Sequence, residues 1–414
     1  MRATTLVKDL LDLPGIVVTG VSMNPGLLTA TVALRARKLR CPLCEYATWS
    51  VYDRRPVEST WRHLDFGANK VVLSASLRRL RCPQHGVVTE YAPFARYRSG
   101  FTAEFEDVAA FLATRTDKSA IARFLRIDWD TVGRIIERVV ATELDAHRLT
   151  DLVAVGVDEI SWRKHHKYLT LVSDHATGKI VWGAAGKDAE TLEGFFDELG
   201  TEGAARIEVA SMDMSPAYRK AFTTHAPDAV ICIDPFHAVK LVTDAFDTVR
   251  RGIWQQMRQI DPQAAKLFKG ARWVLLKNPE TLDDEQNTTL RRLRRRGGAL
   301  WSAYTLKEAF RQIFAGDLNP GQALTLIEHW CRKAEQSGMT AFAKAATTIR
   351  KQLTGITEAI ERRINNGRHE GINTNVRLII RRARGFHSAE AALGLVMLTC
   401  GPIDLYLPHE QRPD

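Results

Sequence analysis

The spacing of hydrophobic and polar positions divides the chain into regions that predict different kinds of structure. Residues 1–100 alternate hydrophobic and polar side chains in short runs, among them GIVVTGVSM, LLTATVALR and KVVLSASLRRLRC. Alternation with a period of two predicts β-strands, and the Asn-Pro-Gly turn between the first two runs predicts a hairpin. We therefore expect a small β-rich module in residues 1–100.

Residues 101–148 follow a helical period instead. The run FTAEFEDVAAFLATRT places hydrophobic side chains three and four residues apart, and DKSAIARFLRI and DWDTVGRIIERVV begin with polar residues that are typical of helix N-termini. A leading helix followed by two short helices and a tight turn is the pattern of a helix-turn-helix DNA-binding domain. The same pattern also fits a plain three-helix packing unit.

The remainder is predicted to form an α/β core with helical additions. Residues 149–235 give the order β-β-β-α-β-α-β, which opens with the hydrophobic run DLVAVGVDEI, as expected of a strand buried on both faces. Residues 236–360 are amphipathic and basic, and they contain almost no strand signal, which predicts an all-helical insertion. Residues 361–414 carry a basic helix and a hydrophobic helix, which we assign to the second part of the core.

Composition and charge narrow the classes of protein. The 414 residues predict two to four domains. The formal net charge of +10 and the pI near 9.4 favour polyanionic partners. No run of about 18 apolar residues is present, so no membrane span is expected. Because the N-terminus also lacks the pattern of a secretory signal, we expect a cytoplasmic, nucleoid-associated protein.

Two pairs of residues predict a structural zinc site. Cys41 and Cys44 are separated by two residues, and so are Cys82 and His85. Zn²⁺ takes four sulfur or imidazole ligands in a tetrahedron, and a two-residue spacer lets both members of a pair face one ion. Four protein ligands leave no open coordination position, so this zinc would stabilise the module rather than carry out chemistry. The other three cysteines lie in apolar sequence and are expected in the core.

Candidate DNA contacts lie on the third helix of the helix-turn-helix. Thr131, Arg134 and Arg138 are expected to be exposed there, where they would face bases or phosphates. In the helical region, the run RRLRRR is either a solvated helix face or a phosphate contact. That region also holds three tryptophans that are either core residues or stacking platforms for an unpaired base: Trp273, Trp301 and Trp330.

Acidic residues after predicted strands form the candidate catalytic site. Asp158 is expected at the end of the first core strand, and Asp213 at the end of a later strand, just before a helix. Two-metal phosphodiester chemistry needs hard oxygen ligands that converge from separate elements. Alternation puts Glu159 on the face opposite Asp158, where it would be solvated or ion-paired. Asp234 also follows a strand and is an alternative to Asp213.

The basic helix near the C-terminus carries a third acid. In HEGINTNVRLIIRRARGF, Glu370 shares one helical face with three arginines: Arg377, Arg381 and Arg384. Apolar residues occupy the other face. A helix-dipole role accounts for Glu370 alone. A metal-binding role beside a phosphate backbone accounts for the acid and the row of arginines together.

These motifs together resemble the bacterial insertion-sequence transposases of the DDE class, specifically the "ISL-three" family. The matching stretches run from the zinc pairs to the basic helix: CPLC…CPQHG, GVDEISWRKHHKYLTLVSD, SMDMSPAYRKA, ICIDPFHAVKL, LLKNPETL and HEGINTNVRLIIRRARGF. The resemblance implies an RNase H-like (retroviral-integrase-like) α/β catalytic core interrupted by an all-α insertion. It assigns the catalytic triad to Asp158, Asp213 and Glu370, because that fold places the second acid on the fourth strand, and Asp234 follows the fifth. His85 stands where many relatives have cysteine.

The resemblance implies a DNA transposase that binds the terminal inverted repeats of an insertion sequence and catalyses metal-dependent cleavage and strand transfer into target DNA. Its cofactors would be Mg²⁺ or Mn²⁺ at the triad and structural Zn²⁺ at the cysteine pairs. Double-stranded DNA is the expected partner, and joining two ends requires a homodimer or a higher assembly. Two alternatives are a non-catalytic DNA-binding regulator that keeps the fold and a simple RNase H-like nuclease.

Overall fold

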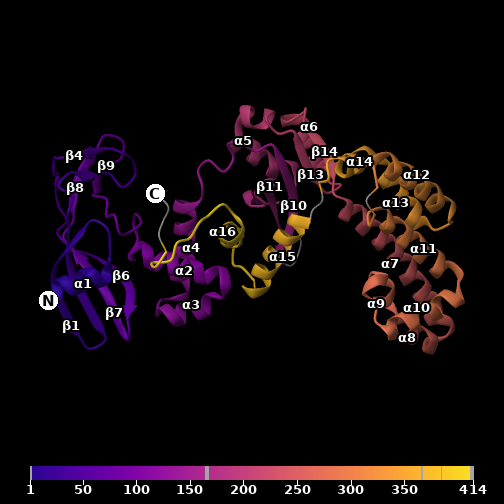
Figure 1. Cartoon of the computed structure of the whole chain (residues 1–414), viewed down its shortest axis with the longest axis horizontal. Coiled ribbons are helices and arrows are strands. Elements are labelled where there is room, and N and C mark those ends of the chain that lie inside the picture. The colour runs from indigo at the N-terminus through magenta and orange to yellow at the C-terminus, as the bar shows by residue number, and fades with distance from the viewer. Residues whose placement is uncertain (1, 164–166, 317, 365–366, 384, 411–414) are drawn as a thin grey trace. The chain divides into compact units, whose positions relative to one another are not determined.

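The chain folds into two compact units (Figure 1). The computed structural model describes residues 2–163, 167–316, 318–364, 367–383 and 385–410. Unit 1 comprises Met1–Arg148 and Asn375–Asp414, and unit 2 comprises Leu149–Thr374.

Unit 1 begins with helix α1 (Ala3–Leu11) and a β-rich module. Its four-stranded sheet has the order β1 (Ile16–Asn24), β2 (Leu27–Leu34), β7 (Asn69–Ala75) and β6 (Ser59–Phe66). Two small sheets hold the other strands: β3 (Leu39–Arg40) with β4 (Ala47–Thr48), and β5 (Asp53–Arg54) with β8 (Arg78–Cys82) and β9 (Gly86–Thr89). The predicted β1–β2 hairpin is confirmed, with Asn24 paired to Leu27 across the turn.

Two features of this module differ from the sequence pattern. The pattern predicts a single strand across residues 70–82, but the structure divides this run between β7 and β8 in different sheets. Arg78 redirects the chain, because its backbone N–H and its Nε both donate to Glu90 Oε1, at 2.8 and 3.0 Å. The pattern also fails to predict α1, which buries Val7 and Leu11 in the core of the four-stranded sheet.

The rest of unit 1 is helical. The predicted helices of residues 101–148 are present as α2 (Ala103–Arg115), α3 (Lys118–Leu125) and α4 (Trp129–Glu143). Asp117 caps α3 by accepting from the N–H groups of Ser119 and Ala120, as its position predicts. The hydrophobic helix α16 (Ala389–Cys400) packs against α2 and α4 in this unit, although the sequence pattern assigns it to the catalytic core.

Unit 2 is built on a five-stranded sheet in the order β12-β11-β10-β13-β14. These strands are β10 (Ala154–Arg163), β11 (Lys167–Asp174), β12 (Ile180–Ala185), β13 (Val209–Met212) and β14 (Val230–Ile233). The first three along the chain are antiparallel, whereas β13 and β14 run parallel to β10. Helices α5 (Ala189–Ala205) and α6 (Pro216–His225) precede β13 and β14, which confirms the predicted order β-β-β-α-β-α-β.

Helices cover both faces of this sheet. On one face, Val155 and Val157 of β10 share a hydrophobic core with α5 and α6. On the other face, Ala154 packs with Ala359 of α14 (Leu353–Glu361). Gly355 permits this close approach of helix to strand, because a Cβ there would lie 2.7 Å from the Cγ1 atom of Ile233.

Between β14 and α14 the described residues form helices and no strands, as predicted for residues 236–360 (Figure 1). The helices are α7 (Pro235–Ile260), α8 (Pro262–Gly270), α9 (Arg272–Leu276), the 3₁₀ helix η1 (Pro279–Thr281), α10 (Asp284–Arg296), α11 (Gly298–Ile313), α12 (Pro320–Gln336) and α13 (Thr340–Lys351). Trp330 is a core residue whose Nε1 donates to the Leu306 carbonyl at 2.8 Å. Trp301 is half-buried against Tyr304, and Trp273 is 63% exposed.

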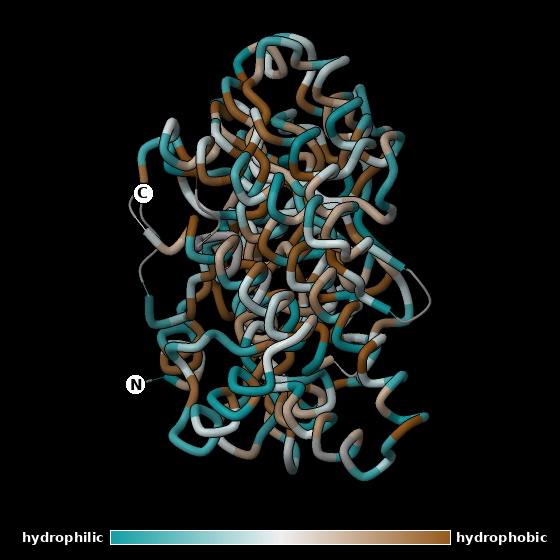
Figure 2. Tube along the Cα trace, turned by 90° about the vertical axis from the view of Figure 1, so that its right-hand side faces the viewer, coloured by the Kyte–Doolittle hydropathy of each residue, from teal (hydrophilic) through white to brown (hydrophobic). Residues whose placement is uncertain are grey.

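Hydrophobic and hydrophilic residues alternate in short stretches along the trace (Figure 2). The hydrophobic helix α16 has 12 residues, about 18 Å at 1.5 Å per residue, against a hydrocarbon thickness of about 30 Å. Within the described part of the chain, no helix is both long enough and apolar enough to cross a membrane.

Candidate functional site

Four side chains of unit 1 converge on one point between β3 and the β8–β9 hairpin. The Sγ atoms of Cys44 and Cys82 are 3.6 Å apart. Nδ1 of His85 lies 3.6 Å from Cys41 Sγ and 3.5 Å from Cys82 Sγ. Ligands at roughly 2.0–2.3 Å on a tetrahedral zinc are separated by roughly 3.4–3.8 Å. The ligand atoms all lie within 4.8 Å of one another, so the predicted set fits a Zn²⁺ ion.

Backbone hydrogen-bond donors stabilise the turns that carry these zinc-binding side chains. The N–H of Cys41 donates to the Tyr46 carbonyl at 2.8 Å, which closes the first turn. Although burial raises it, the pKa of the Cys82 thiol is lowered to about 6, because the backbone N–H groups of His85 and Gln84 point toward it. A thiol that deprotonates this readily is suited to zinc, which binds the thiolate.

The helix-turn-helix presents fewer exposed polar side chains than its pattern predicts. Arg134 of α4 is exposed. Thr131 is only 9% exposed, and its Oγ1 accepts from Arg134 at 3.0 Å, so the prediction that Thr131 is exposed is wrong. Arg138 is half-buried, and its Nε donates to the buried Glu106 at 2.7 Å. The difference at Arg138 arises because α4 packs against α2, which carries Glu106.

Two of the predicted acids lie on or directly after neighbouring parallel strands of the unit 2 sheet. Strands β10 and β13 are parallel and pair Gly156 with Ser211. Asp158 and Asp213 each follow two residues after this pair, with Asp213 just beyond the end of β13. The pattern predicts Asp158 at the end of its strand, but Asp158 lies within β10. Strand β10 continues to Arg163 because it pairs with β11.

Asp213 lies in a polar and partly buried environment. It follows β13 directly, and its Oδ1 accepts from the Ser215 N–H at 2.8 Å at the start of α6. Burial raises the pKa of Asp213, and the negative charge of Asp158 adds to this, while the Ser215 N–H, His237 and Lys240 act in the opposite direction. A carboxylate whose ionisation is opposed by a neighbouring carboxylate is a suitable place for a cation, which relieves the repulsion.

Glu159 enters the same site from the other face of β10. Its N–H donates to Asp158 Oδ1 at 2.7 Å, and its side chain lines a cleft of about 400 Å³ together with Asp213. Burial and the charge of Asp213 raise the pKa of Glu159, whereas Lys187 lowers it. Glu159 is therefore half-buried beside the candidate catalytic acid, rather than a solvated surface charge.

Two basic side chains of α7 line this cleft, and the sequence pattern alone does not indicate their role. His237 and Lys240 are three residues apart and so share a helix face. Asp234, the alternative acid, caps α7 by accepting from the Phe236 N–H at 3.0 Å, and its Oδ2 lies 3.7 Å from His237 Nε2. The spacing His-x-x-Lys after a strand-end acid is the signal that points to these two residues.

The basic helix of the sequence is α15 (Gly367–Arg382), which crosses the boundary between the two units after Thr374. Glu370 falls in the first turn of this helix. Its side chain lies outside the described residues, so its position relative to Asp158 and Asp213 stays a prediction.

The two faces of α15 divide as the pattern predicts. Arg377 and Arg381 are exposed, whereas Val376 and Ile379 are 0% and 2% exposed. Arg384 lies outside the described residues. For the side chains that the structure describes, the apolar face is buried and the arginine face is open to solvent.

Three profiles of known protein families match the chain. A family profile described as "Transposase", of the DDE type in ISL3, matches residues 155–393. Profiles for the "Helix-turn-helix domain of transposase family ISL3" and the "zinc-finger of transposase IS204/IS1001/IS1096/IS1165" match residues 91–140 and 31–85.

Curated relatives agree with these profiles. The chain is 37% identical over 382 residues to the "Transposase for insertion sequence element IS1557" of Mycobacterium tuberculosis. The matched region covers 87% of this chain and 85% of the relative. It is 30% identical over 332 residues to the "Transposase for insertion sequence element IS1001" of Bordetella parapertussis, which covers 80% of this chain and 81% of the relative.

Proposed function

The chain belongs to the ISL3 family of insertion-sequence transposases, and from this premise we propose that Asp158, Asp213 and Glu370 hold two Mg²⁺ or Mn²⁺ ions for DNA cleavage and strand transfer. The observation that supports this proposal is the parallel register of β10 and β13, which pairs Gly156 with Ser211, two residues before Asp158 and Asp213 respectively. Hard carboxylate oxygens on rigid neighbouring strands are a suitable ligand set for Mg²⁺.

We assign the unit 2 sheet to the RNase H-like class. The sheet order, with three antiparallel strands first and two parallel strands on the far side of β10, supports this assignment. The helices between β14 and α14 would then be the all-α insertion. The second acid follows the fourth strand in such a core, which favours Asp213 over Asp234.

Several side chains in and beside the cleft have distinct tasks in this mechanism. When bound, the two ions would activate the attacking oxygen and stabilise the leaving one. Asp158 and Asp213 hold the ion positions, and the Ser215 N–H fixes the Asp213 carboxylate. On the α7 side of the cleft, Lys240 supplies positive charge and His237 lies beside Asp234, and both can donate to phosphate oxygens of the scissile strand.

DNA recognition is assigned to unit 1. We propose that α4 lies in the major groove of the terminal inverted repeat with Arg134 as its leading contact. Thr131 holds the Arg134 guanidinium, and Arg138 positions α4 through Glu106. The Cys41, Cys44, Cys82 and His85 set holds structural Zn²⁺. Arg377, Arg381 and Arg384 follow the DNA backbone on from Glu370.

The setting follows from this chemistry. The substrates are two copies of the terminal repeat and a target duplex, so the active complex contains at least two protomers. The protein acts in the cytoplasm, at the nucleoid.

The decisive experiment is a Mg²⁺-dependent nicking and strand-transfer assay on terminal-repeat DNA. Asp158→Asn, Asp213→Asn and Glu370→Gln should each abolish cleavage while end binding is kept. Asp228→Asn, which changes an exposed aspartate outside the cleft, is the matched control and should cleave like wild type.

Two results would overturn the proposal. If wild type and Asp213→Asn bind verified ends but are equally inert, the chain is a DNA-binding regulator. If wild type cuts without strand transfer, it is a simple nuclease.

A further inference from the structure

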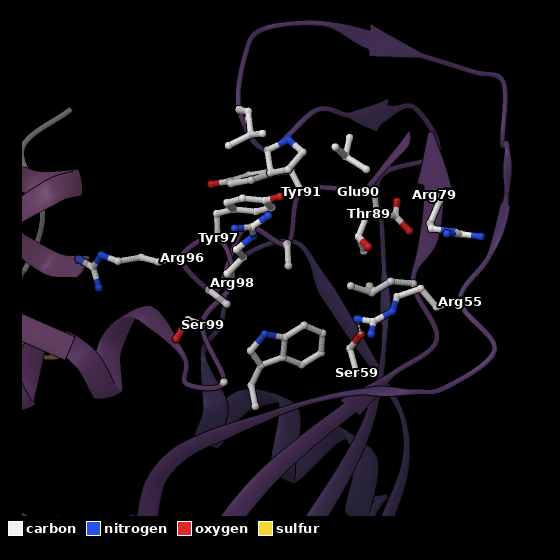
Figure 3. A pocket seen from close by; sticks show the side chains of 18 of the residues that line it. Arg55, Ser59, Arg79, Thr89, Glu90, Tyr91, Arg96, Tyr97, Arg98 and Ser99 are labelled. Atoms are coloured by element: carbon white, nitrogen blue, oxygen red, sulfur yellow. Dashed lines mark hydrogen bonds between the residues drawn. The ribbon is translucent and has the colours of Figure 1, made fainter. Parts of the chain in front are cut away.

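Unit 1 contains a cleft of about 1050 Å³ that the proposed mechanism does not use (Figure 3). Strand β6 lines one side with Ser59 and Trp61, the zinc-binding turns contribute Leu43 and His85, and residues 91–100 line another side. Trp61 is packed edge-on against Phe94, with ring centroids 5.0 Å apart. The volume reaches the top of the range for small-molecule sites, which suits an extended ligand better than a compact one.

The walls of this cleft carry cations and hydroxyl groups. Figure 3 shows Tyr91, Tyr97 and Arg98 on one side and Arg55 on the other. Arg55 donates to Ser59 Oγ at 2.9 Å, and the Arg98 guanidinium lies 5.2 Å from the centroid of the Tyr97 ring. In the part of the chain that the structure describes, neither guanidinium is paired with a carboxylate. Arginine and tyrosine side chains of this kind are typical contacts to DNA phosphate and sugar.

The two acids that line the cleft are outnumbered by its four arginines. Glu90 is buried and paired with Arg78, whereas Glu58 is exposed and accepts from the Ser74 hydroxyl. The module as a whole is strongly basic, because residues 1–100 contain 15 Lys and Arg against 7 Asp and Glu. That surplus of eight positive charges is most of the net charge of +10 of the whole chain, so a polyanion is the favoured occupant.

A buried ionic network fixes one wall of the cleft to the helix-turn-helix. Arg96, which precedes Tyr97 and Arg98, turns away from the cleft toward the helices (Figure 3). Its guanidinium donates to Asp107 of α2 at 2.6 Å and also to Glu143 of α4. The wall and α4 are thus held in one rigid arrangement.

The loop on this wall is also held in a less favourable backbone conformation. Arg98 has a φ of +58°, in the left-handed region that costs a non-glycine residue about 1 kcal/mol or more. Ser99 braces it, since its hydroxyl donates to Glu106 at 2.7 Å and accepts from the Phe101 N–H at 2.9 Å. Strain kept by such bracing is a common property of binding loops.

We propose that this cleft binds the sugar–phosphate backbone of the terminal-repeat DNA beside the segment read by α4, with Arg55 and Arg98 as phosphate contacts. The inference rests on the proposed function, since it adds a second DNA contact to the same recognition unit. The ionic network then fixes the distance along the DNA between the two contacts.

The test measures the binding of full-length protein to terminal-repeat duplex across a range of salt concentrations. Each lost phosphate contact should flatten the slope of log K against log salt by about 0.9. If a variant and wild type bind equally at 1 M salt, this difference in slope makes the variant bind about eightfold more weakly than wild type at 0.1 M salt. Arg55→Gln and Arg98→Gln should each show this loss. Arg54→Gln, which removes the charge of the exposed neighbouring residue outside the cleft, should change neither quantity by more than about 0.3 in slope or about twofold in affinity.

Hydroxyl-radical footprinting on the same duplex locates the contact. Wild type should protect a tract of sugars beside the α4 site, and the Arg55→Gln/Arg98→Gln double variant should lose that tract while it keeps the rest. Zinc content and hydrogen exchange of β6 and β8 confirm that the variant is folded.

Three outcomes would overturn the proposal, and they separate it from the proposed function. If wild type binds terminal repeats no better than a scrambled duplex, both proposals fail. If wild type is specific but the double variant matches Arg54→Gln, the cleft proposal fails and the transposase mechanism stands. If the double variant changes only the oligomeric mass, the cleft receives a second copy of the chain rather than DNA.

Discussion

Replacing Arg96 with Met should weaken the junction between the zinc-binding module and the helix-turn-helix more than any exposed substitution nearby. The Arg96 side chain is 6% exposed and makes its bonds in several directions. Nε donates to Thr142 Oγ1 at 2.8 Å, and the terminal nitrogens donate to the Ala103 carbonyl at 3.2 Å and to Asp107 at 2.6 Å. Met keeps the aliphatic stem and removes all of these donors.

The expected loss of stability arises from the buried carboxylates that Arg96 neutralises in wild type. Asp107 and Glu106 are 3% and 0% exposed, so each needs a cationic neighbour. Glu106 keeps Arg138 at 2.7 Å, whereas Asp107 loses the guanidinium that neutralises it. Removing one partner of a buried ion pair typically costs about 3–5 kcal/mol. For a unit of this size, the loss corresponds to a decrease in melting temperature of roughly 6–20 °C.

Hydrogen exchange is the suitable assay, because a chain of two units need not unfold in one step. Amides of α2 and α4 should exchange faster in Arg96→Met by the factor that corresponds to about 3–5 kcal/mol, while β10 and β13 in unit 2 stay unchanged. Arg98→Met is the matched control, since it changes an exposed arginine two residues away and should cost less than about 0.5 kcal/mol. Equal protection of α2 in both variants would show that the Arg96 ion pairs do not stabilise these helices.

Other perturbations test separate parts of the structure. Cys41→Ser should remove about one equivalent of zinc, measured by mass spectrometry of the metal, and unchanged zinc content would reject the site. Burial and the Arg62 charge lower the pKa of His63 from 6.5 to about 4, so unit 1 should lose stability as the pH falls from 6.5 toward 4, by at most about 3 kcal/mol. Urea unfolding across this pH range should show that slope, and His63→Gln should flatten it. Gly355→Ala should destabilise unit 2 by about 1–3 kcal/mol, because the added Cβ would lie 2.7 Å from Cγ1 of Ile233. Gly371→Ala is the control, since its Cβ would meet no atom within 4 Å, and it should leave unit 2 equally or more stable. Equal losses of stability in urea unfolding would contradict this.

Periodicity in the sequence predicts the parts of the fold that depend on local geometry. Alternation predicts the β1–β2 hairpin, and buried hydrophobic runs predict the strand order of unit 2. Polar residues before helical runs predict the start of α3 at Asp117. In each of these cases one residue and its near neighbours contain the information.

Where the structure differs from the sequence-based predictions, contacts between residues distant in sequence are the cause. Arg138 and Glu106 are 32 positions apart, and no local pattern indicates that they pair. Thr131 is buried in a helix that packs on α2, α3 and α16, although periodicity alone places it on the polar face. Glu159 is a further example, because alternation predicts its face correctly but cannot show that this face borders the cleft beside Asp213.

The distribution of charge separates DNA binding from catalysis in this chain. Residues 1–100 hold 15 Lys and Arg against 7 Asp and Glu, so the remaining residues hold 43 against 41 and are nearly neutral. Binding that rests on the basic module should weaken steeply with salt, because each phosphate contact contributes a slope of about 0.9. The carboxylates of unit 2 act over short distances on ions already in place, where screening matters less. Single-turnover cleavage by preformed complexes should therefore change less than about threefold between 50 and 200 mM salt, while the affinity for ends falls about 10³-fold or more if six or more phosphates are contacted. Parallel losses in both quantities would show that the two units share one electrostatic site.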